Sequence, residues 1–439
     1  MNAASGAPVG ALPTAAVVAV AVPAGRSAGE PARRSAGRGR GRSAGFWLGL
    51  VLVLAALAAL RLGAVPVTWA RLPGLLAEGA AQAWRPLWPA SVGGSVPVTV
   101  ATGATGSGPA VAADDSASPG PAAAADPSSA FDTTRHDTAS ADAAQAWVLW
   151  QLRLPRVLLA LTVGAALGLA GALTQGLFRN PMADPGLLGV SAGAACAAAL
   201  MLTVFAGAEQ RLPPAWRLWL LPGAAFAGAL AVCGLLDRLA RWLAPGSVAG
   251  LLLTGLALQA LTMAVVGLCT WLATDEQARS LSFWTLGSLA GARWSVLGLL
   301  ALVLAAVALA LPRLSTALNA LALGEAAAGH VGVDVARLRR RVSLAVALLV
   351  ALATAWCGLI GFIGLMAPHL VRLVAGPDQR RVLPLSMGVG ALLLLGADSL
   401  ARTLAVPAEL PVGIFTALLG APMFMALLRG RLRQAGGAA

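Results

Sequence analysis

Few side chains in this sequence could carry out chemistry. It contains no lysine, so it can form neither a lysine Schiff base nor the G-x-x-x-x-G-K-[ST] loop that holds nucleotide phosphates. If ATP drives this protein, a separate chain must hydrolyse it. The histidines His136, His330 and His369 lie far apart in the sequence, which argues against a zinc or haem site within the chain.

The cysteines lie in apolar segments and lack the spacing of metal ligands (Cys196, Cys233, Cys269 and Cys357). We interpret them as small core residues, because unpaired cysteine behaves as a small apolar side chain. The apolar part of the chain also offers no cluster of histidine, cysteine or carboxylate side chains. We therefore expect no catalytic residue, metal or cofactor in this chain. If ATP drives the protein, a partner would bind the ATP and Mg²⁺.

The composition indicates a membrane protein. Hydrophobic residues occupy 58% of the 439 positions and charged residues 11%, whereas soluble domains average roughly 25% charged residues. Several apolar blocks reach the roughly 20 residues that a helix needs to cross a bilayer. The expected fold is all-α and polytopic, with about ten transmembrane helices.

Arginine supplies the net charge of +13. The arginines gather at the ends of apolar blocks, so membrane topology explains them better than nucleic-acid binding does. We expect a disordered tail over 1–45 and a first span over 46–66. Further helical blocks are expected at about 154–178, 186–206, 217–240, 249–272, 294–312, 342–362, 363–375, 382–404 and 412–428.

The same distribution predicts that both termini are cytoplasmic, because positive residues favour that side of a membrane. Residues 67–146 then form an external loop, which contains a disordered insert over 90–144 that is rich in small and polar residues. The apolar core follows over 147–430. Several outer arginines break the simple rule and need another explanation, notably Arg153, Arg156, Arg279 and Arg293.

The longest polar interruption of the core is the run from Leu318 to Arg341. Its start has helical spacing, Gly329 and Gly332 then break the pattern, and Asp334 can cap a second helix. The arginines between 337 and 341 predict a cytoplasmic position. From spacing alone, an ordinary connecting loop and a docking surface for a cytoplasmic partner both stay open.

Two segments interrupt the apolar sequence with glycine and proline. The first contains Asn180-Pro181 and Asp184-Pro185, and the second runs from Gly358 to Arg372. Non-helical backbone at membrane depth is tolerated where protein or a cavity covers it. One interpretation is a transporter built from repeats, and the other is close helix packing by small residues.

Eight motifs follow one another along the core: LWQLRLPR (149–156), QGLFRNPMADPGLLGVSAGA (175–194), LLLTGLAL (251–258), FWTLGSLAG (283–291), LGEAAAGHVGV (323–333), GFIGLMAPHLVRL (361–373), ADSLAR (397–402) and ELPVGIFTALLGAP (409–422). Together they resemble the permease subunits of bacterial ABC importers for iron-siderophores, haem and vitamin B12, the FecCD/BtuC type. The tail and the insert depart from the usual pattern of that family.

The resemblance implies a type II ABC importer permease fold, and a homodimer around a central pathway in the bacterial inner membrane. Two ATPase subunits would dock on the cytoplasmic side, and a periplasmic binding protein would dock outside. The run 318–341 matches the ATPase-docking loop of the family. Its candidate contact residues are Leu323, Gly324, Glu325, Gly329, His330 and Gly332.

Further positions take their roles from the same resemblance. The loop 244–249 matches the cytoplasmic gate, with the candidate gate or pathway residues Pro245, Gly246, Ser247 and Gly255. The structural motifs place Asn180, Pro181, Asp184, Pro185, Gly189, Pro368, His369, Pro411 and Gly413 at matching positions. Arg153, Arg156 and Arg402 match arginines that receive acidic side chains of the binding protein. Contact with lipid phosphates or local pairing is the other interpretation of these arginines.

The rival functional class is a proton-coupled secondary transporter, which needs ionisable groups within the membrane. Asp398 is the only acid well inside a predicted span, and an ion pair with Arg402, four residues later, is its plainer role. A membrane enzyme is a third class, which the lack of clustered polar groups disfavours. The sequence does not identify the transported chelate.

Overall fold

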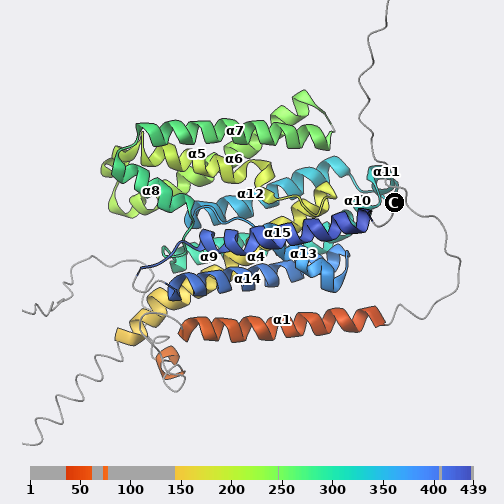
Figure 1. Cartoon of the computed structure of the whole chain (residues 1–439), viewed down its shortest axis with the longest axis horizontal. Coiled ribbons are helices and arrows are strands. Elements are labelled where there is room, and N and C mark those ends of the chain that lie inside the picture. The colour runs from red at the N-terminus through yellow and green to blue at the C-terminus, as the bar shows by residue number, and fades with distance from the viewer. Residues whose placement is uncertain (1–35, 62–72, 78–143, 246, 405–407, 437–439) are drawn as a thin grey trace, which may run out of the picture.

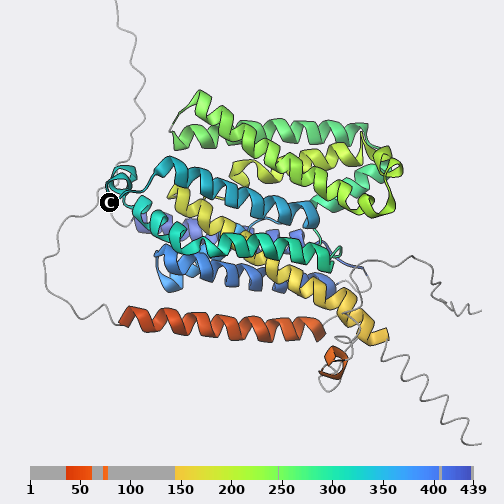
Figure 2. The same cartoon turned by 180° about the vertical axis from the view of Figure 1, so that it is seen from behind.

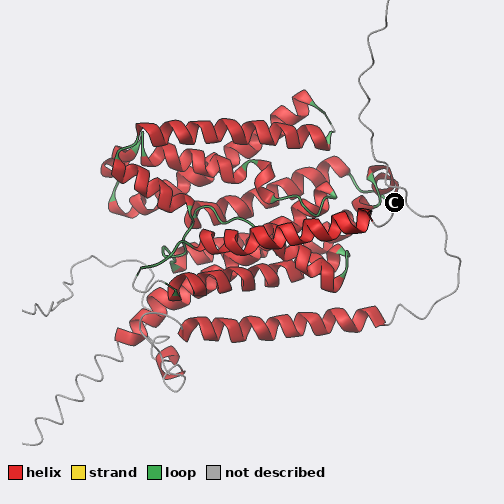
Figure 3. Cartoon of the chain, in the orientation of Figure 1, coloured by secondary structure: helices red, strands yellow, loops and turns green. Residues whose placement is uncertain are grey.

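The computed structural model describes residues 36–61, 73–77, 144–245, 247–404 and 408–436. All regular structure in these ranges is helical (Figure 3). The expected disorder at 1–35 and 90–143 falls outside the described residues, and so does Gly246.

The first long helix is α1 (Ala36–Arg61), and a π-helical turn, η2 (Leu149–Arg153), leads into α4 (Leu154–Phe178). The middle of the chain forms η3 (Pro185–Leu188), α5 (Val190–Leu202), η4 (Ala206–Arg211), α6 (Pro214–Leu243), α7 (Val248–Leu272), α8 (Asp275–Thr285) and α9 (Trp294–Leu309). The last part forms α10 (Leu311–Ala322), α11 (Glu325–His330), α12 (Val335–Cys357), α13 (Ile363–Ala375), α14 (Gln379–Thr403) and α15 (Val412–Gly436).

Five helices of the described chain are long and apolar enough to cross a membrane: Ala144–Phe178, which contains η2 and α4, and α6, α7, α12 and α14. α9 and α10 pass the same test as a pair bent by 55°. Shorter apolar helices lie at Gly45–Arg61, Val190–Leu202, Ile363–Ala375 and Val412–Ala426. These segments match the apolar blocks expected from the sequence and confirm the all-α, polytopic fold.

Several helix bounds differ from the expected ones, notably those of α1, of the span containing α4, and of α12. α1 begins at Ala36, so residues 36–45 of the expected disordered tail are helical. The span containing α4 begins at Ala144 instead of near 154, because the π-helical turn η2 lets the helix continue into Pro155. α12 begins at Val335, directly after its cap, and ends at Cys357, where Gly358 takes a φ of 69°.

α4 is the central helix of the bundle, and it packs against α14, α13, α12 and α9. Figures 1 and 2 show α4 surrounded by these helices, with α1 and α7 at opposite edges. Glycines allow this close packing, because a Cβ added at Gly168 would lie 2.2 Å from the Ser386 carbonyl oxygen on α14. The small residues of α4 therefore act in helix packing.

Different short helices lie at the two ends of the bundle. α11 lies at one end and α8 at the other (Figure 1). At the α8 end, the N–H groups of Val412 and Gly413 donate to the carbonyls of Gly287 and Leu286, at 3.0 and 3.1 Å. These bonds join the start of α15 to the turn that follows α8.

Candidate functional site

The polar run at the α11 end folds as a helix, a turn, a short helix and a second turn. Gly324 and Gly332 adopt φ values of 117° and 82° on either side of α11, a conformation that favours glycine. Asp334 caps α12 as expected, since its carboxylate accepts the N–H of Arg337 at 2.9 Å. That backbone hydrogen bond lowers the pKa of Asp334.

Gly332 breaks the helical pattern as predicted, but the other break in this run lies at a different glycine from the expected one. Gly329 is inside α11 rather than in a turn, and Gly324 supplies the first break. Hydropathy spacing did not distinguish the two, because only backbone dihedrals separate a helical glycine from one at positive φ.

Exposed apolar side chains flank α11. Leu323 and Val331, at its two ends, are 81% and 70% exposed. Glu325 forms an ion pair with Arg339 of α12 at 3.2 Å, which ties the short helix to the next one. His330 is exposed beside Val331. Val331 was missed from the sequence, although its exposure makes it a candidate contact residue equal to Leu323.

A polar clamp, also missed from the sequence, connects α10 to the start of α14. The Asn319 side-chain amide donates to Asp378 at 2.7 Å, and the N–H of Gln379 donates to the Asn319 oxygen at 3.0 Å. Burial raises the pKa of Asp378, but its hydrogen bonds to Arg380 and Asn319 outweigh this and lower it overall. The clamp holds the helix that precedes α11 against the bundle.

A buried ion cluster lies at the α8 end. Asp398 of α14 is fully buried and pairs with Arg402 and Arg156, each at 3.0 Å. Arg156 of α4 also pairs with the half-exposed Glu409 at 2.8 Å. Arg153 donates to the carbonyl of Leu60 on α1 at 3.1 Å. The cluster thus joins α4, α14, α1 and the segment before α15.

The expected local pair of Arg402 with Asp398 is confirmed. Arg153 and Arg402 are 7% and 8% exposed, so Arg156 is the member of the predicted docking ring that reaches surface charge, through Glu409. The pairing of Arg156 with Asp398 joins residues 242 positions apart, which local spacing does not predict. The docking role of the three arginines stays a prediction.

The predicted gate loop begins after α6. Ser247 caps α7, because its hydroxyl accepts the N–H of Gly250 at 3.0 Å. Pro245 and Ser247 are exposed. Gly255 is buried, and a Cβ there would lie 2.5 Å from the carbonyl oxygen of Leu187. Gly255 therefore packs α7 against η3, and the gate role of the loop stays a prediction.

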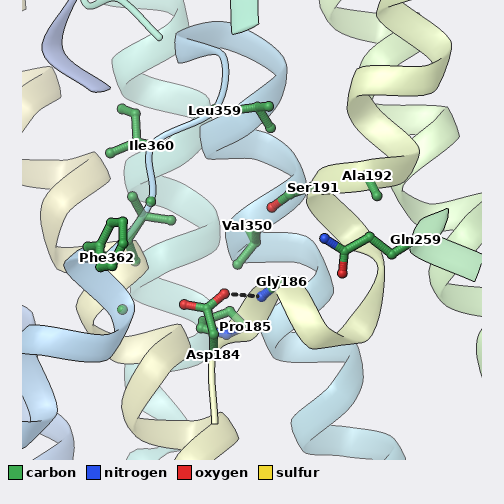
Figure 4. Close-up of a pocket in the computed structure, with 13 residues that line it drawn as sticks. Asp184, Pro185, Gly186, Ser191, Ala192, Gln259, Val350, Leu359, Ile360 and Phe362 are labelled. Carbon is green, nitrogen blue, oxygen red and sulfur yellow. Dashed lines mark hydrogen bonds between the residues drawn. The ribbon is translucent and has the colours of Figure 1, made fainter. Parts of the chain in front are cut away.

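A cavity of about 240 Å³ lies where the two broken segments meet. Figure 4 shows Asp184, Ser191 and Gln259 on its wall, with Phe362 from the second segment. The Asp184 carboxylate accepts the N–H of Gly186 at 2.7 Å. The cavity offers a carboxylate, a hydroxyl and an amide to a polar group or water. No group of three possible metal ligands occurs among the residues that the structure describes.

The structural-motif residues shape the two broken segments. Asn180 accepts the N–H of Met182 at 2.9 Å beside Pro181, and Asp184 caps the turn that Pro185 opens and Gly189 ends at a φ of 72°. In the second segment, Pro368 and His369 are buried inside α13. Pro411 precedes α15, and a Cβ at Gly413 would lie 2.2 Å from the Leu286 carbonyl oxygen.

Comparison with known proteins gives these sites a context. The hemin transport system permease protein HmuU of Yersinia pestis is 45% identical over 311 residues, which cover 69% of this chain and 89% of that protein. The vitamin B12 import system permease protein BtuC of Vibrio cholerae is 43% identical over 281 residues, covering 64% and 82%. BtuC of Halobacterium salinarum, a cobalamin import permease, is 42% identical and covers 65% and 74%.

A solved structure is also similar to this chain. A transporter assigned to the metal-chelate ABC type, in an inward-facing conformation, is 28% identical, has a TM-score of 0.63, and matches 89% of this chain and 99% of its own. The model of the FecCD transport family matches residues 121–430, which hold both broken segments, the α11 run and the ion cluster. The chain therefore belongs to the FecCD transport family.

Proposed function

We propose that this chain is the permease subunit of an ATP-driven importer, which moves haem, a ferric siderophore or a cobalamin-type chelate across the bacterial inner membrane by alternating access. The names of the hemin and vitamin B12 relatives support this cargo class. The chain supplies the pathway, and a separate ATPase subunit binds and hydrolyses ATP with Mg²⁺.

The exposed apolar ends of α11 carry this proposal. Leu323 and Val331 offer apolar surface on either side of α11, next to the turns at Gly324 and Gly332. The Glu325–Arg339 pair and the Asn319–Asp378 clamp hold the neighbouring helices in place. A rigid protrusion of this kind suits the transfer of motion from an ATPase subunit to the spans. We propose that two copies of the chain bind two ATPase subunits here and a periplasmic binding protein at the α8 end.

Replacing Gly329 with tryptophan should abolish ATPase binding. A Cβ at Gly329 meets no atom within 4 Å, so a substitution begins without a clash, and a large side chain at this exposed position would project into the space where the partner would dock. We expect ATPase co-purification and ATP-dependent uptake of hemin or cyanocobalamin into vesicles to fall by roughly tenfold or more, as for a disrupted interface centre.

Gly207→Trp is the matched control, because Gly207 is also open and exposed but lies at the other end. That variant should retain the ATPase. Normal ATPase binding by Gly329→Trp would contradict the docking assignment. Uptake that follows a proton gradient without the ATPase would instead support the rival transporter class, against which the pairing of Asp398 with two arginines argues.

The proposed topology places α11 and both termini in the cytoplasm and α8 in the periplasm, as the arginine distribution predicts. In a chain whose natural cysteines are replaced, Ser280→Cys on α8 should react with an impermeant thiol reagent in intact spheroplasts. Ala326→Cys on α11 should react only after lysis. Both side chains are exposed, so access and not burial decides the result. The reverse labelling pattern would invert the topology.

A further inference from the structure

A second cavity lies at the α8 end, apart from the sites described above. Its volume is about 250 Å³, and its walls come from the starts of α6 and α9 and the end of α12. Trp219 and Trp356 form an edge-to-face pair in it, with ring centroids 4.8 Å apart. Arg293 and Ser295 line the same cavity.

This cavity lies at the ends of two apolar helices long enough to cross a membrane. Trp219 lies in the first turn of the span Trp216–Leu243, and Trp356 is the second-last residue of α12. Tryptophan favours the membrane–water interface, because its ring is apolar and its N–H is polar. Only 11% of the span window in α6 is buried within the chain, so most of this helix is not covered by the rest of the chain.

Within the described part of the chain, the polar side chains that line the cavity form no hydrogen bond or ion pair. Arg293 is exposed and forms no ion pair with any acid in the described part of the chain, and the Ser295 hydroxyl has no hydrogen bond there. Arg293 is also one of the outer arginines that the positive-inside tendency does not explain. A guanidinium at headgroup level is suited to hold a phosphodiester through two parallel hydrogen bonds.

We propose that this cavity binds the headgroup of an anionic phospholipid in the outer leaflet of the inner membrane. Arg293 and Ser295 donate to its phosphate, while Leu218 and the Trp219–Trp356 pair contact the glycerol and the first methylenes. No acid lines the cavity, so its charge favours a net anionic lipid such as phosphatidylglycerol over a zwitterionic one. The choice of leaflet rests on the proposed topology, whereas the site itself does not.

The test measures lipid binding by the purified full-length chain in detergent, by native mass spectrometry with added phosphatidylglycerol. Arg293→Gln should weaken binding about tenfold, the loss expected for one charge-assisted contact. Arg279→Gln is the matched control, since Arg279 is an exposed outer arginine on α8 that does not line the cavity. Thermal unfolding checks that both variants are folded.

Three results would overturn the proposal. They are equal lipid binding by Arg293→Gln and the natural chain, an equal loss with Arg279→Gln, and phosphatidylcholine binding as tight as phosphatidylglycerol binding. Inorganic phosphate is tested as a separate ligand. Binding of phosphate alone would be a fourth result against the proposal, because it would assign the site to the free ion. Loss of phosphatidylglycerol binding in Trp219→Leu, with Arg293 intact, would support the proposed contact between the Trp219–Trp356 pair and the lipid.

Discussion

Replacing Asp398 with leucine should destabilise the folded chain by about 3–5 kcal/mol, the usual effect of removing one partner of a buried ion pair. Asp398 is fully buried and neutralises Arg402, which is itself 8% exposed. Without it, Arg402 loses its acidic partner on α14 in a low-dielectric environment. We expect a large fall in the amount of folded protein in membranes and in its thermal midpoint in detergent.

Two variants separate this effect from a general sensitivity to charge. Glu409→Gln removes the other ion pair of Arg156. Because the Glu409 side chain is 51% exposed, this change should alter stability by only about 0–1 kcal/mol. Asp398→Leu combined with Arg402→Leu replaces both buried charges with apolar groups and should recover much of the loss. A single Asp398→Leu chain as stable as the natural one would refute this role of the cluster.

Local patterns in the sequence predicted the helices well. The expected block 154–178 has the same bounds as α4, and the block 249–272 differs from α7 by one residue. The cap at Asp334 and the pair of Asp398 with Arg402 were also predicted, because both depend on residues three or four positions apart. These features need only helical periodicity and short-range chemistry.

Features that depend on distant parts of the chain could not be predicted. The Arg156–Asp398 pair and the Asn319–Asp378 clamp form only after α4 and α10 pack against α14. Burial of Arg153 and Arg402 likewise depends on α1, whose carbonyls face them. A charged residue near a span end therefore looks the same in the sequence whether it faces a partner or a neighbouring helix.

Among the glycines in the described part of the chain, Gly171 leaves the least room for a side chain. A Cβ at this residue of α4 would lie 1.8 Å from the carbonyl oxygen of Gly364 and 2.6 Å from its Cα, so backbone atoms of α13 must move. Gly364 has little freedom, because a Cβ there would in turn lie 3.0 Å from Pro185, and that turn forms the cavity wall. One added methyl group on α4 thus disturbs the contact between the two broken segments.

Gly171→Ala should therefore destabilise the chain by about 1–3 kcal/mol or more, as overpacking of a well-packed core does, and should reduce transport further by shifting the cavity walls. Gly396→Ala is the matched control, because Gly396 is a helical glycine of α14 with no atom within 4 Å of an added Cβ. It should leave stability unchanged or raise it by up to about 1 kcal/mol through helix propensity. Thermal midpoints of both variants in the same detergent test this, and equal midpoints would show that α4 and α13 are less closely packed than the structure has them.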